Sequence, residues 1–347
     1  MRKTNLFNFA AGVLLLAAVP LGIAAAWGGH GGQKSQGKDE YRLEGPFTQG
    51  NLTVFLIHGK DKIKGQTFIT LQEALIQKKV IVRETRTVNE LSIENISGDE
   101  VFVQSGDIVK GGQQDRMLVV DLILPPRSGR IPIAAFCVEN GRWSKRGSEE
   151  VTTFNSSSNA VASREVKLAA KSKGSQGDVW REVAVAQEKL SSNVGGNVQN
   201  HASPTSLQLA LENKQVQKTA ENYVAALSGI VSGKTDVIGY VFAINGKINS
   251  ADIYASSALF KKLWPKLLQA SAIEAIAELR RGEKFTAPAA DAVRGFLDDS
   301  PNATEKGKDV SSRVQMVTRE SSGKVFFETR DRAKSDVWVH RNVIRKD

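Results

Sequence analysis

The sequence predicts an α+β protein whose N-terminal part is a β-rich unit, either a sandwich or a strongly curved sheet. Between residues 51 and 143, short apolar runs alternate with polar residues and are separated by Pro, Ser and Gly, as in antiparallel strands with one buried face. Between residues 160 and 347, stretches with helical spacing are followed by a hairpin and further strand-like runs. We therefore expect one large domain over residues 41–347, made of these two parts.

The β-rich part divides into short elements. The patterns predict a strand over 52–58, a helix over 71–79, a strand over 80–84 and a hairpin over 91–104. Two further strands, on either side of PPRSGR, are expected to pair within 117–137. Placing Leu124 opposite Ile131 puts every inner pair on one apolar face, and it also puts Arg116 opposite Glu139.

The second part begins after Trp143 with a polar stretch, 144–163, which we expect to be a surface loop. Helical spacing predicts one helix over 178–190, a second that starts at Pro204 after a Ser203 cap, and a third over 258–279 that is kinked or started at Pro265. Asn245-Gly246 fits the type I′ turn of a hairpin. The remaining strands are expected over 313–320, 324–331 and 336–344.

The N-terminus has the layout of a secretory signal. Arg2 and Lys3 precede an apolar run, and Ala24, Ala25 and Ala26 end it. We expect residues 1–26 to be removed, residues 27–40 to form a flexible spacer, and the protein to be periplasmic or extracellular. If the signal is not cleaved, residues 7–27 are long enough to anchor the chain, and they are its only expected contact with a membrane.

Composition narrows the class of partner. The formal charge is +10, but Lys and Arg are scattered and aromatic residues make up only 7%, so nucleic acid is not an expected partner. The chain has one cysteine, and its four histidines lack the spacing of metal ligands. We predict no metal and no cofactor.

Two motifs carry most of the polar chemistry, GGQQDR at 111–116 and CVENGRW at 137–143. The predicted pairing brings both to the open end of one hairpin. Glycine N–H groups, amides, guanidiniums and an indole at one rim would suit an anion or a sugar phosphate. The ligand-binding candidates are Gly111, Gly112, Gln113, Gln114, Arg116, Arg142 and Trp143.

Each of these residues also has a purely structural interpretation. Gly111-Gly112 can be a bulge or bend, Arg116 with Glu139 a cross-strand ion pair, and Cys137 a small buried hydrophobic side chain. If the chain is an enzyme, Glu139 and Asp115 are the candidates for acid or base.

The same two blocks carry a resemblance to a bacterial domain family. The blocks GGxQDR at 111–116 and CxExGRW at 137–143, together with Gly106, Asp107, Pro126 and Pro132, resemble the signature of the ARG and rhodanese-phosphatase-superfamily-associated proteins. The similarity runs from about Leu52 to Ile276. The resemblance implies an association with ADP-ribosyl-glycohydrolases and rhodanese-like phosphatases. It implies no assigned activity.

Three functions remain open at this point. The first is an envelope protein that binds an anionic or glycosyl ligand, or a protein partner, at the rim of the two motifs. The second is a hydrolase or transferase acting on a nucleotide-sugar-like or phosphoester substrate, with Arg116 and Arg142 holding the anion. The third is a structural scaffold in the envelope.

Overall fold

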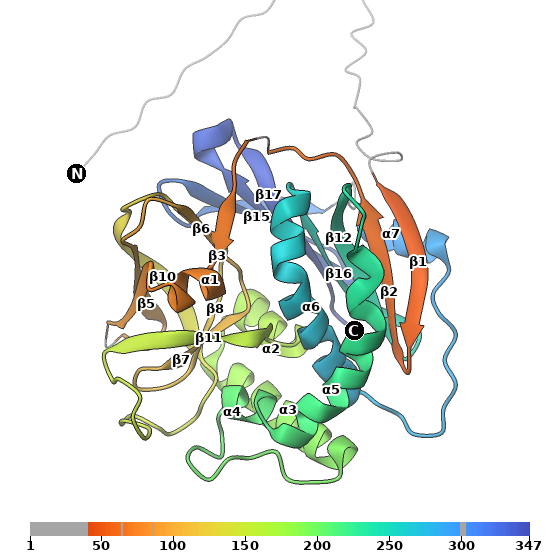
Figure 1. The fold of residues 1–347 in the computed structure, drawn as a ribbon, viewed down its shortest axis with the longest axis horizontal. Helices are drawn as coiled ribbons and strands as arrows, with labels where there is room; N and C mark the ends of the chain where they lie inside the picture. Colours follow the sequence, from red (N-terminus) through yellow and green to blue (C-terminus); the bar gives the residue numbers. More distant parts are fainter. Residues whose placement is uncertain (1–40, 64, 86, 299–302) are drawn as a thin grey trace, which may run out of the picture. The chain divides into compact units, whose positions relative to one another are not determined.

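The structure is a computed structural model, and it describes residues 41–63, 65–85, 87–298 and 303–347. The expected signal, anchor and spacer lie outside these residues. Within them, no helix has both the length and the apolar character needed to cross a membrane. The described chain has the α+β content that the sequence predicts (Figure 1).

The largest sheet of the described chain has eight antiparallel strands, two from residues 42–58 and six from residues 237–345. Their order is β1-β2-β12-β13-β17-β16-β15-β14. The bounds are β1 Arg42–Gln49, β2 Leu52–His58, β12 Val237–Ile244, β13 Lys247–Tyr254, β14 Thr304–Asp309, β15 Val314–Glu320, β16 Lys324–Asp331 and β17 Val337–Arg345.

The second sheet is a closed six-stranded antiparallel barrel. The strongly curved sheet that the sequence predicts is therefore curved enough to close on itself. Its order is β10-β5-β4-β11-β7-β8. The bounds are β4 Val80–Glu84, β5 Glu90–Asn95, β7 Asp107–Gly111, β8 Arg116–Leu118, β10 Gly129–Cys137 and β11 Thr153–Val161. Three short strands, β3 Phe68–Thr70, β6 Glu100–Val103 and β9 Leu122–Leu124, form a separate sheet in which β3 and β6 are parallel.

The helices cover the sheets. They are α1 Leu71–Ile76, α2 Arg164–Leu168, the π-helical turn η1 Ala169–Lys173, α3 Gln176–Val194, α4 Leu207–Leu211, α5 Lys214–Leu227, α6 Ser257–Ala277 and α7 Ala290–Leu297, with short 3₁₀ turns η2 Ser228–Val231 and η3 Arg332–Lys334.

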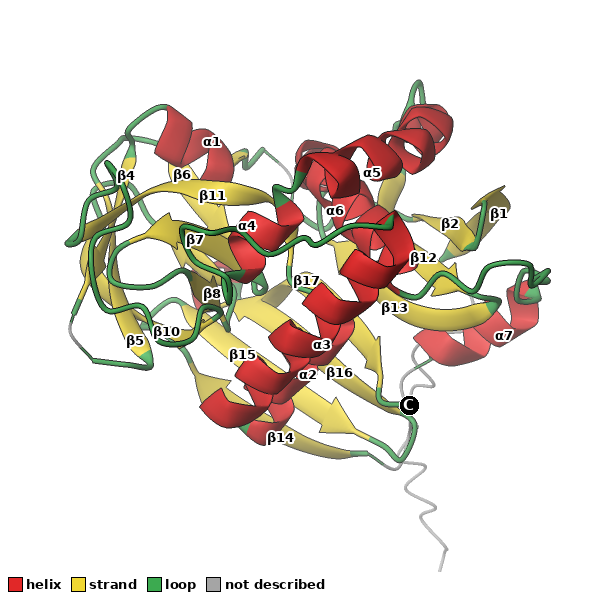
Figure 2. Cartoon of the chain, turned by 90° about the horizontal axis from the view of Figure 1, so that it is seen from below, coloured by secondary structure: helices red, strands yellow, loops and turns green. Residues whose placement is uncertain are grey.

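Strand β2 shows how the layers are built. Val54 and Leu56 point into the main core, which α6 completes, whereas Phe55 and Ile57 point to the opposite face, where Val293 of α7 packs. Every residue of β2 is therefore buried, because both faces of the sheet are covered. Figure 2 shows α5 and α6 above β12 and β13, and α7 below them.

The predicted strand pairing around PPRSGR is wrong. The apolar run 117–124 breaks at Asp121, so that β8 lies in the barrel and β9 pairs with β6. β10 pairs with β8 in a register two residues away from the predicted one, with Cys137 opposite Arg116. A shift of two residues keeps each side chain on its predicted face, which is why the apolar pattern could not distinguish the two registers.

Three other local predictions are corrected. The hairpin over 91–104 does not form, because β5 lies in the barrel and β6 in the small sheet. The expected surface loop 144–163 contains β11, a polar strand that pairs with β4 and β7. The helix from Pro204 is two helices, and Asn213 caps the second by accepting a hydrogen bond from the N–H of Gln215.

Several predictions are confirmed. The strands 52–58 and 80–84 have the predicted bounds, and the last three strands are present. Asn245 and Gly246, with φ values of 52° and 74°, form the turn between β12 and β13. Helix α6 starts at Ser257 and continues through Pro265.

One strand was not predicted. Strand β14 is an edge strand whose six residues are all exposed, so it has no apolar pattern that would reveal it.

Candidate functional site

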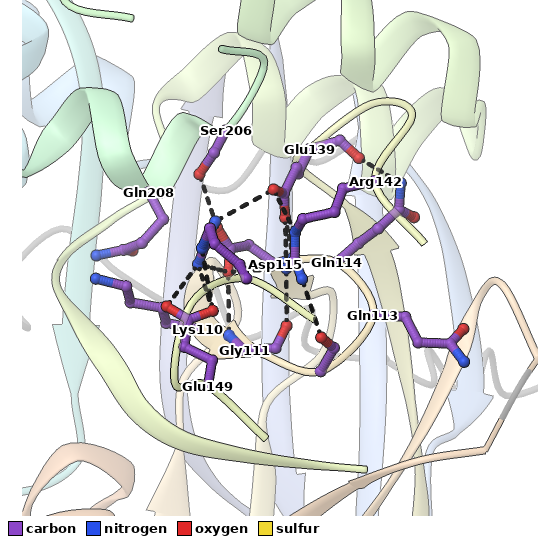
Figure 3. A network of polar contacts seen from close by, with 12 residues as sticks. Lys110, Gly111, Gln113, Gln114, Asp115, Glu139, Arg142, Glu149, Ser206 and Gln208 are labelled. Carbon is purple, nitrogen blue, oxygen red and sulfur yellow. Dashed lines mark hydrogen bonds and ion pairs between the residues drawn. The ribbon is translucent and has the colours of Figure 1, made fainter. Parts of the chain in front are cut away.

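The two motifs meet at one end of the barrel, as the sequence predicts. GGQQDR lies between β7 and β8, and CVENGRW includes the end of β10 and the turn that follows it. The Arg142 guanidinium donates hydrogen bonds of 3.1 Å to the carbonyl oxygens of both Gly111 and Gly112 (Figure 3). Gly111 and Gly112 have φ values of 122° and 56°, so the bend between the strands requires glycine.

The centre of this region is a buried network of two carboxylates and two guanidiniums. Asp115 and Glu139 have no exposed surface. Arg146 donates to both carboxylate oxygens of Asp115 at 2.9 and 2.8 Å, and it reaches Glu139 at 3.2 Å. Arg142 donates to the two oxygens of Glu139 at 2.6 and 2.8 Å. Because the charges balance, the groups can stay ionised out of water.

The pKa shifts agree with this balance. Burial opposes the ionisation of Glu139, but the hydrogen bonds from Arg142, Ser203 and the N–H of Asp115 outweigh it, and the pKa of Glu139 is lowered. Burial also opposes the charge of Arg146, but Asp115 and Glu149 outweigh it and raise the pKa of the guanidinium. Glu139 therefore stays ionised near neutral pH and is not prepared to act as a general acid.

Arg116 does not pair with Glu139, contrary to the predicted register. Its guanidinium lies 3.3 Å from a carboxylate oxygen of Glu84, donates to the carbonyl of Val88, and is 5.8 Å from the ring centre of Trp143. The shift of two residues places Arg116 beside β4 instead of beside the turn after β10. Its side chain is fully buried, and its Nε–H has no partner among the described residues.

Cys137 is buried, as predicted. It lies opposite Arg116 on β10, and burial raises the pKa of its thiol. A raised thiol pKa lowers the fraction of thiolate, which is the reactive form.

Most donors of the predicted rim are engaged within the chain. The N–H of Gly111 donates to Asp115, that of Gly112 to the carbonyl of Glu150, and that of Gln113 to Glu84. Gln114 is fully buried and donates to the carbonyl of Glu139. Of the seven ligand-binding candidates, Gln113 and Trp143 keep side-chain surface that is not tied into the network.

The network also fixes the position of a helix. The hydroxyl of Ser206 donates to Asp115 at 2.7 Å and accepts the N–H of Leu209, so Ser206 is both the N-cap of α4 and a member of the cluster. The N–H of Leu207 donates to the carbonyl of Val138. Residues of both motifs therefore hold the start of α4 against the barrel.

Helix α4 forms one wall of a cleft of about 490 Å³ between the barrel and the helices. The other walls come from α1, β11, α5 and α6. Amide and hydroxyl side chains dominate its lining: Gln72, Ser156, Ser157, Ser158, Asn159, Gln208, Gln217 and Gln269. Glu212 is its single charged lining residue within the described chain, and Leu75, Ile76 and Leu211 add apolar surface.

Gln208 is the most informative residue of this cleft. It is 2% exposed, and its Nε2 donates to Glu212 at 2.7 Å. Its Oε1 is buried and has no hydrogen-bond partner among the described residues. A buried amide oxygen without a donor is unfavourable, so Oε1 is an acceptor whose hydrogen-bonding capacity is unused within the described chain. Figure 3 shows Gln208 beside Lys110, whose ammonium pairs with Glu212 at 2.6 Å.

In the comparison with protein-family models, residues 40–344 match the ARG and Rhodanese-Phosphatase-superfamily-associated Protein domain (ARPP-1). The chain belongs to this family. The match extends beyond the resemblance seen in the sequence at both ends, so the ARPP-1 domain includes the barrel, the helices and all of the large sheet except Arg345. The comparisons with curated proteins and with solved structures found no match.

Within this ARPP-1 domain, the sequence did not reveal Arg146, Ser206 or the cleft. Arg146 lies in a stretch expected to be a solvated loop, and Ser206 lies inside the helix expected from Pro204. The amides of the cleft stand on five separate elements, where each looks like an ordinary surface residue. No group of three or more His, Cys, Asp or Glu side chains in the described part is arranged to hold a metal ion.

Proposed function

We propose that this protein is an exported binding protein that holds an uncharged glycosyl ligand in the amide-lined cleft. The observation that carries the proposal is a cleft of about 490 Å³, a size typical of small-molecule sites, whose lining includes Gln208 with its unpartnered Oε1. Amides and hydroxyls both donate and accept hydrogen bonds, and they therefore complement the hydroxyl groups of a sugar.

The charge of the lining favours a neutral ligand over an anion. No Lys or Arg is among the described lining residues, and the guanidiniums of the nearby network are bonded within the chain. Ile76, 75% exposed at the edge of the cleft, offers apolar surface for the C–H face of a sugar ring. The GGQQDR motif helps to position one wall of the cleft, because Asp115 accepts a hydrogen bond from Ser206, the N-cap of α4.

Binding is favoured over hydrolysis because glycoside hydrolysis generally requires two carboxyl groups that flank the scissile bond. Glu212 is the one carboxylate in the described lining of the cleft, and it is paired with Lys110.

Export is proposed from the N-terminal sequence. If the signal is cleaved, N-terminal sequencing of the protein from the envelope fraction should give a sequence that begins at or near Trp27. An uncleaved cytoplasmic product would contradict export.

Titration calorimetry with neutral tetrasaccharides of glucose, galactose and N-acetylglucosamine tests the proposal. At least one should bind, and Gln208→Leu should weaken its binding by at least about tenfold, because one hydrogen bond to a buried amide is worth roughly 1.4 kcal/mol or more. Gln199→Leu, at an exposed position outside the cleft, is the matched control. Binding that survives in Gln208→Leu, or no binding across the panel, would overturn the proposal, and turnover of a bound sugar would indicate the hydrolase instead.

A further inference from the structure

Strand β11 contributes consecutive residues, 156–160, to the lining of the cleft. In a regular strand, successive side chains point to opposite faces, so only alternate residues could line one space. The register of β11 on β7 explains the difference, because Ser157 lies opposite Val109 whereas Val161 lies opposite Asp107. The segment of β11 between these pairs is longer than the matching segment of β7, so the strand bulges at the cleft, as strands often do next to active sites.

A buried lysine holds one hydroxyl of this bulged segment. Lys266 of α6 is 6% exposed, and its ammonium group donates to a carboxylate oxygen of Asp107 at 2.6 Å and to the Oγ of Ser157 at 3.2 Å. Asp107 is itself buried, and it is one of the residues that carry the family resemblance. The start of β7 is therefore connected, through α6, to the lining of the cleft.

This contact fixes the direction in which Ser157 can form a further hydrogen bond. An ammonium group has no lone pair, so Lys266 donates and the oxygen of Ser157 accepts. The hydroxyl proton of Ser157 must then point elsewhere. Its acceptor within the described chain is the carbonyl of Ser158 at 3.5 Å, which is longer than the usual distance of about 2.5–3.0 Å for a hydroxyl donor. Ser157 therefore brings to the cleft a donor that the chain itself uses only weakly.

Aliphatic side chains share the lining with this donor. Leu75 and Ile76 of α1 and Leu211 of α4 belong to the same cleft. A hydroxyl donor and aliphatic surface in one cleft complement a carbonyl oxygen that carries a methyl group. A sugar hydroxyl fits this combination less well, because it has no methyl group and brings a proton of its own that needs a further acceptor.

We propose that the cleft selects acetamido sugars, with the acetamido carbonyl oxygen accepting a hydrogen bond from Ser157 and the acetyl methyl group packed against the aliphatic part of the lining. Ser157 is then a specificity-determining residue, and Lys266 is a positioning residue that acts through it. The inference rests on the proposed function, because it names the kind of sugar that the same cleft holds.

Calorimetry with two matched ligands tests the inference. Chitotetraose and cellotetraose have the same backbone and the same linkage, and they differ only in an acetamido or a hydroxyl group on each ring. The protein should bind chitotetraose at least about tenfold more tightly, because of one added hydrogen bond and one buried methyl group. Equal affinities, or binding of a glucose or galactose oligomer without chitotetraose, would overturn the inference and leave the proposed function standing. No binding of any of these sugars would overturn both.

Substitutions of Ser157 locate the contact. Ser157→Ala removes the donor and should reduce the preference for chitotetraose over cellotetraose to within about threefold, whereas Ser157→Thr keeps a hydroxyl group and should retain the preference. Ser192→Ala, at an exposed position of α3 outside the cleft, is the control and should bind both ligands as the wild type does. Thermal unfolding of each variant checks that it is folded. An unchanged preference in Ser157→Ala would place the acetamido group elsewhere and overturn the proposal.

Discussion

At the scale of single residues, the charged groups of the two motifs are bonded to one another inside the protein. Asp115 and Glu139 accept most of their hydrogen bonds from Arg142, Arg146 and Ser206, and both carboxylates are fully buried. A buried ion network is costly to break, because removal of one partner leaves an uncompensated charge in a low dielectric. Arg146 pairs with both buried carboxylates and with Glu149.

Arg146→Met should therefore destabilise the protein by about 3–5 kcal/mol, since Asp115 and Glu139 would share a single guanidinium. Urea unfolding followed by far-UV circular dichroism measures the change. Arg280→Met is the matched control, because Arg280 is 55% exposed and its pair with Glu283 spans 3.6 Å; it should change stability by less than about 0.5 kcal/mol. Equal effects of the two substitutions would show that the network is not a structural element.

Cys137 provides a second test at this scale. Its thiol is fully buried and has a raised pKa, so labelling with a disulfide reagent at pH 7.5 should be at least about 100-fold slower in the native protein than in urea. Absorbance of the released thiolate follows the reaction. Fast labelling of the folded protein would indicate that the end of β10 opens readily, or that Cys137 is reactive.

At the scale of elements, the bend between β7 and β8 leaves no room for a side chain at Gly112. A Cβ atom at Gly112 would lie 2.5 Å from Cζ of Phe154 and 2.6 Å from a carboxylate oxygen of Glu84, at a φ of +56°. Phe154 belongs to β11 and Glu84 to β4, so the glycine allows three barrel strands to approach one another.

Gly112→Ala should cost about 2–4 kcal/mol, because steric overlap adds to the unfavourable φ. Gly141→Ala, at a φ of +85° with open space around the position, should cost only about 1 kcal/mol. Chemical denaturation of both variants gives the comparison. A larger loss in Gly141→Ala would mean that the crowding at Gly112 is relieved by movement of Phe154.

At the scale of the whole molecule, a buried histidine of the large sheet contacts the segment that connects the barrel to the small sheet. His340 of β17 lies 2.8 Å from Asp121, which follows β8, and 3.0 Å from Asp252 of β13. Tyr254 stacks on the imidazole at 4.5 Å. Burial opposes the charge on His340, but the two carboxylates outweigh burial and raise its pKa to about 9.

This raised pKa predicts the direction of a pH effect. A histidine that binds its proton more tightly in the folded state stabilises the fold fully below its unfolded pKa of about 6.5, and this contribution is lost as the pH rises toward about 9. Relative to His340→Gln, the wild type should therefore lose stability between pH 6.5 and 9. Unfolding free energies of both proteins across this range measure the difference. Parallel curves would mean that His340 is neutral in the fold.

The sequence by itself determined the class of fold, most strands and helices, the family, and the meeting of GGQQDR with CVENGRW. These features follow from local patterns, because alternation of apolar and polar residues indicates which face of a strand is buried, and turn residues indicate where the strand ends. The same patterns do not name the partner strand. Only the tertiary structure decided that β1 and β2 join the C-terminal strands and that the polar strand β11 is part of the barrel. It also decided that Arg116 pairs with Glu84, because a register shift of two residues leaves every side chain on the same face and is invisible in the pattern. The cleft was hidden for a related reason, since amides on five elements are ordinary surface residues until packing places them around one space and leaves Oε1 of Gln208 without a donor.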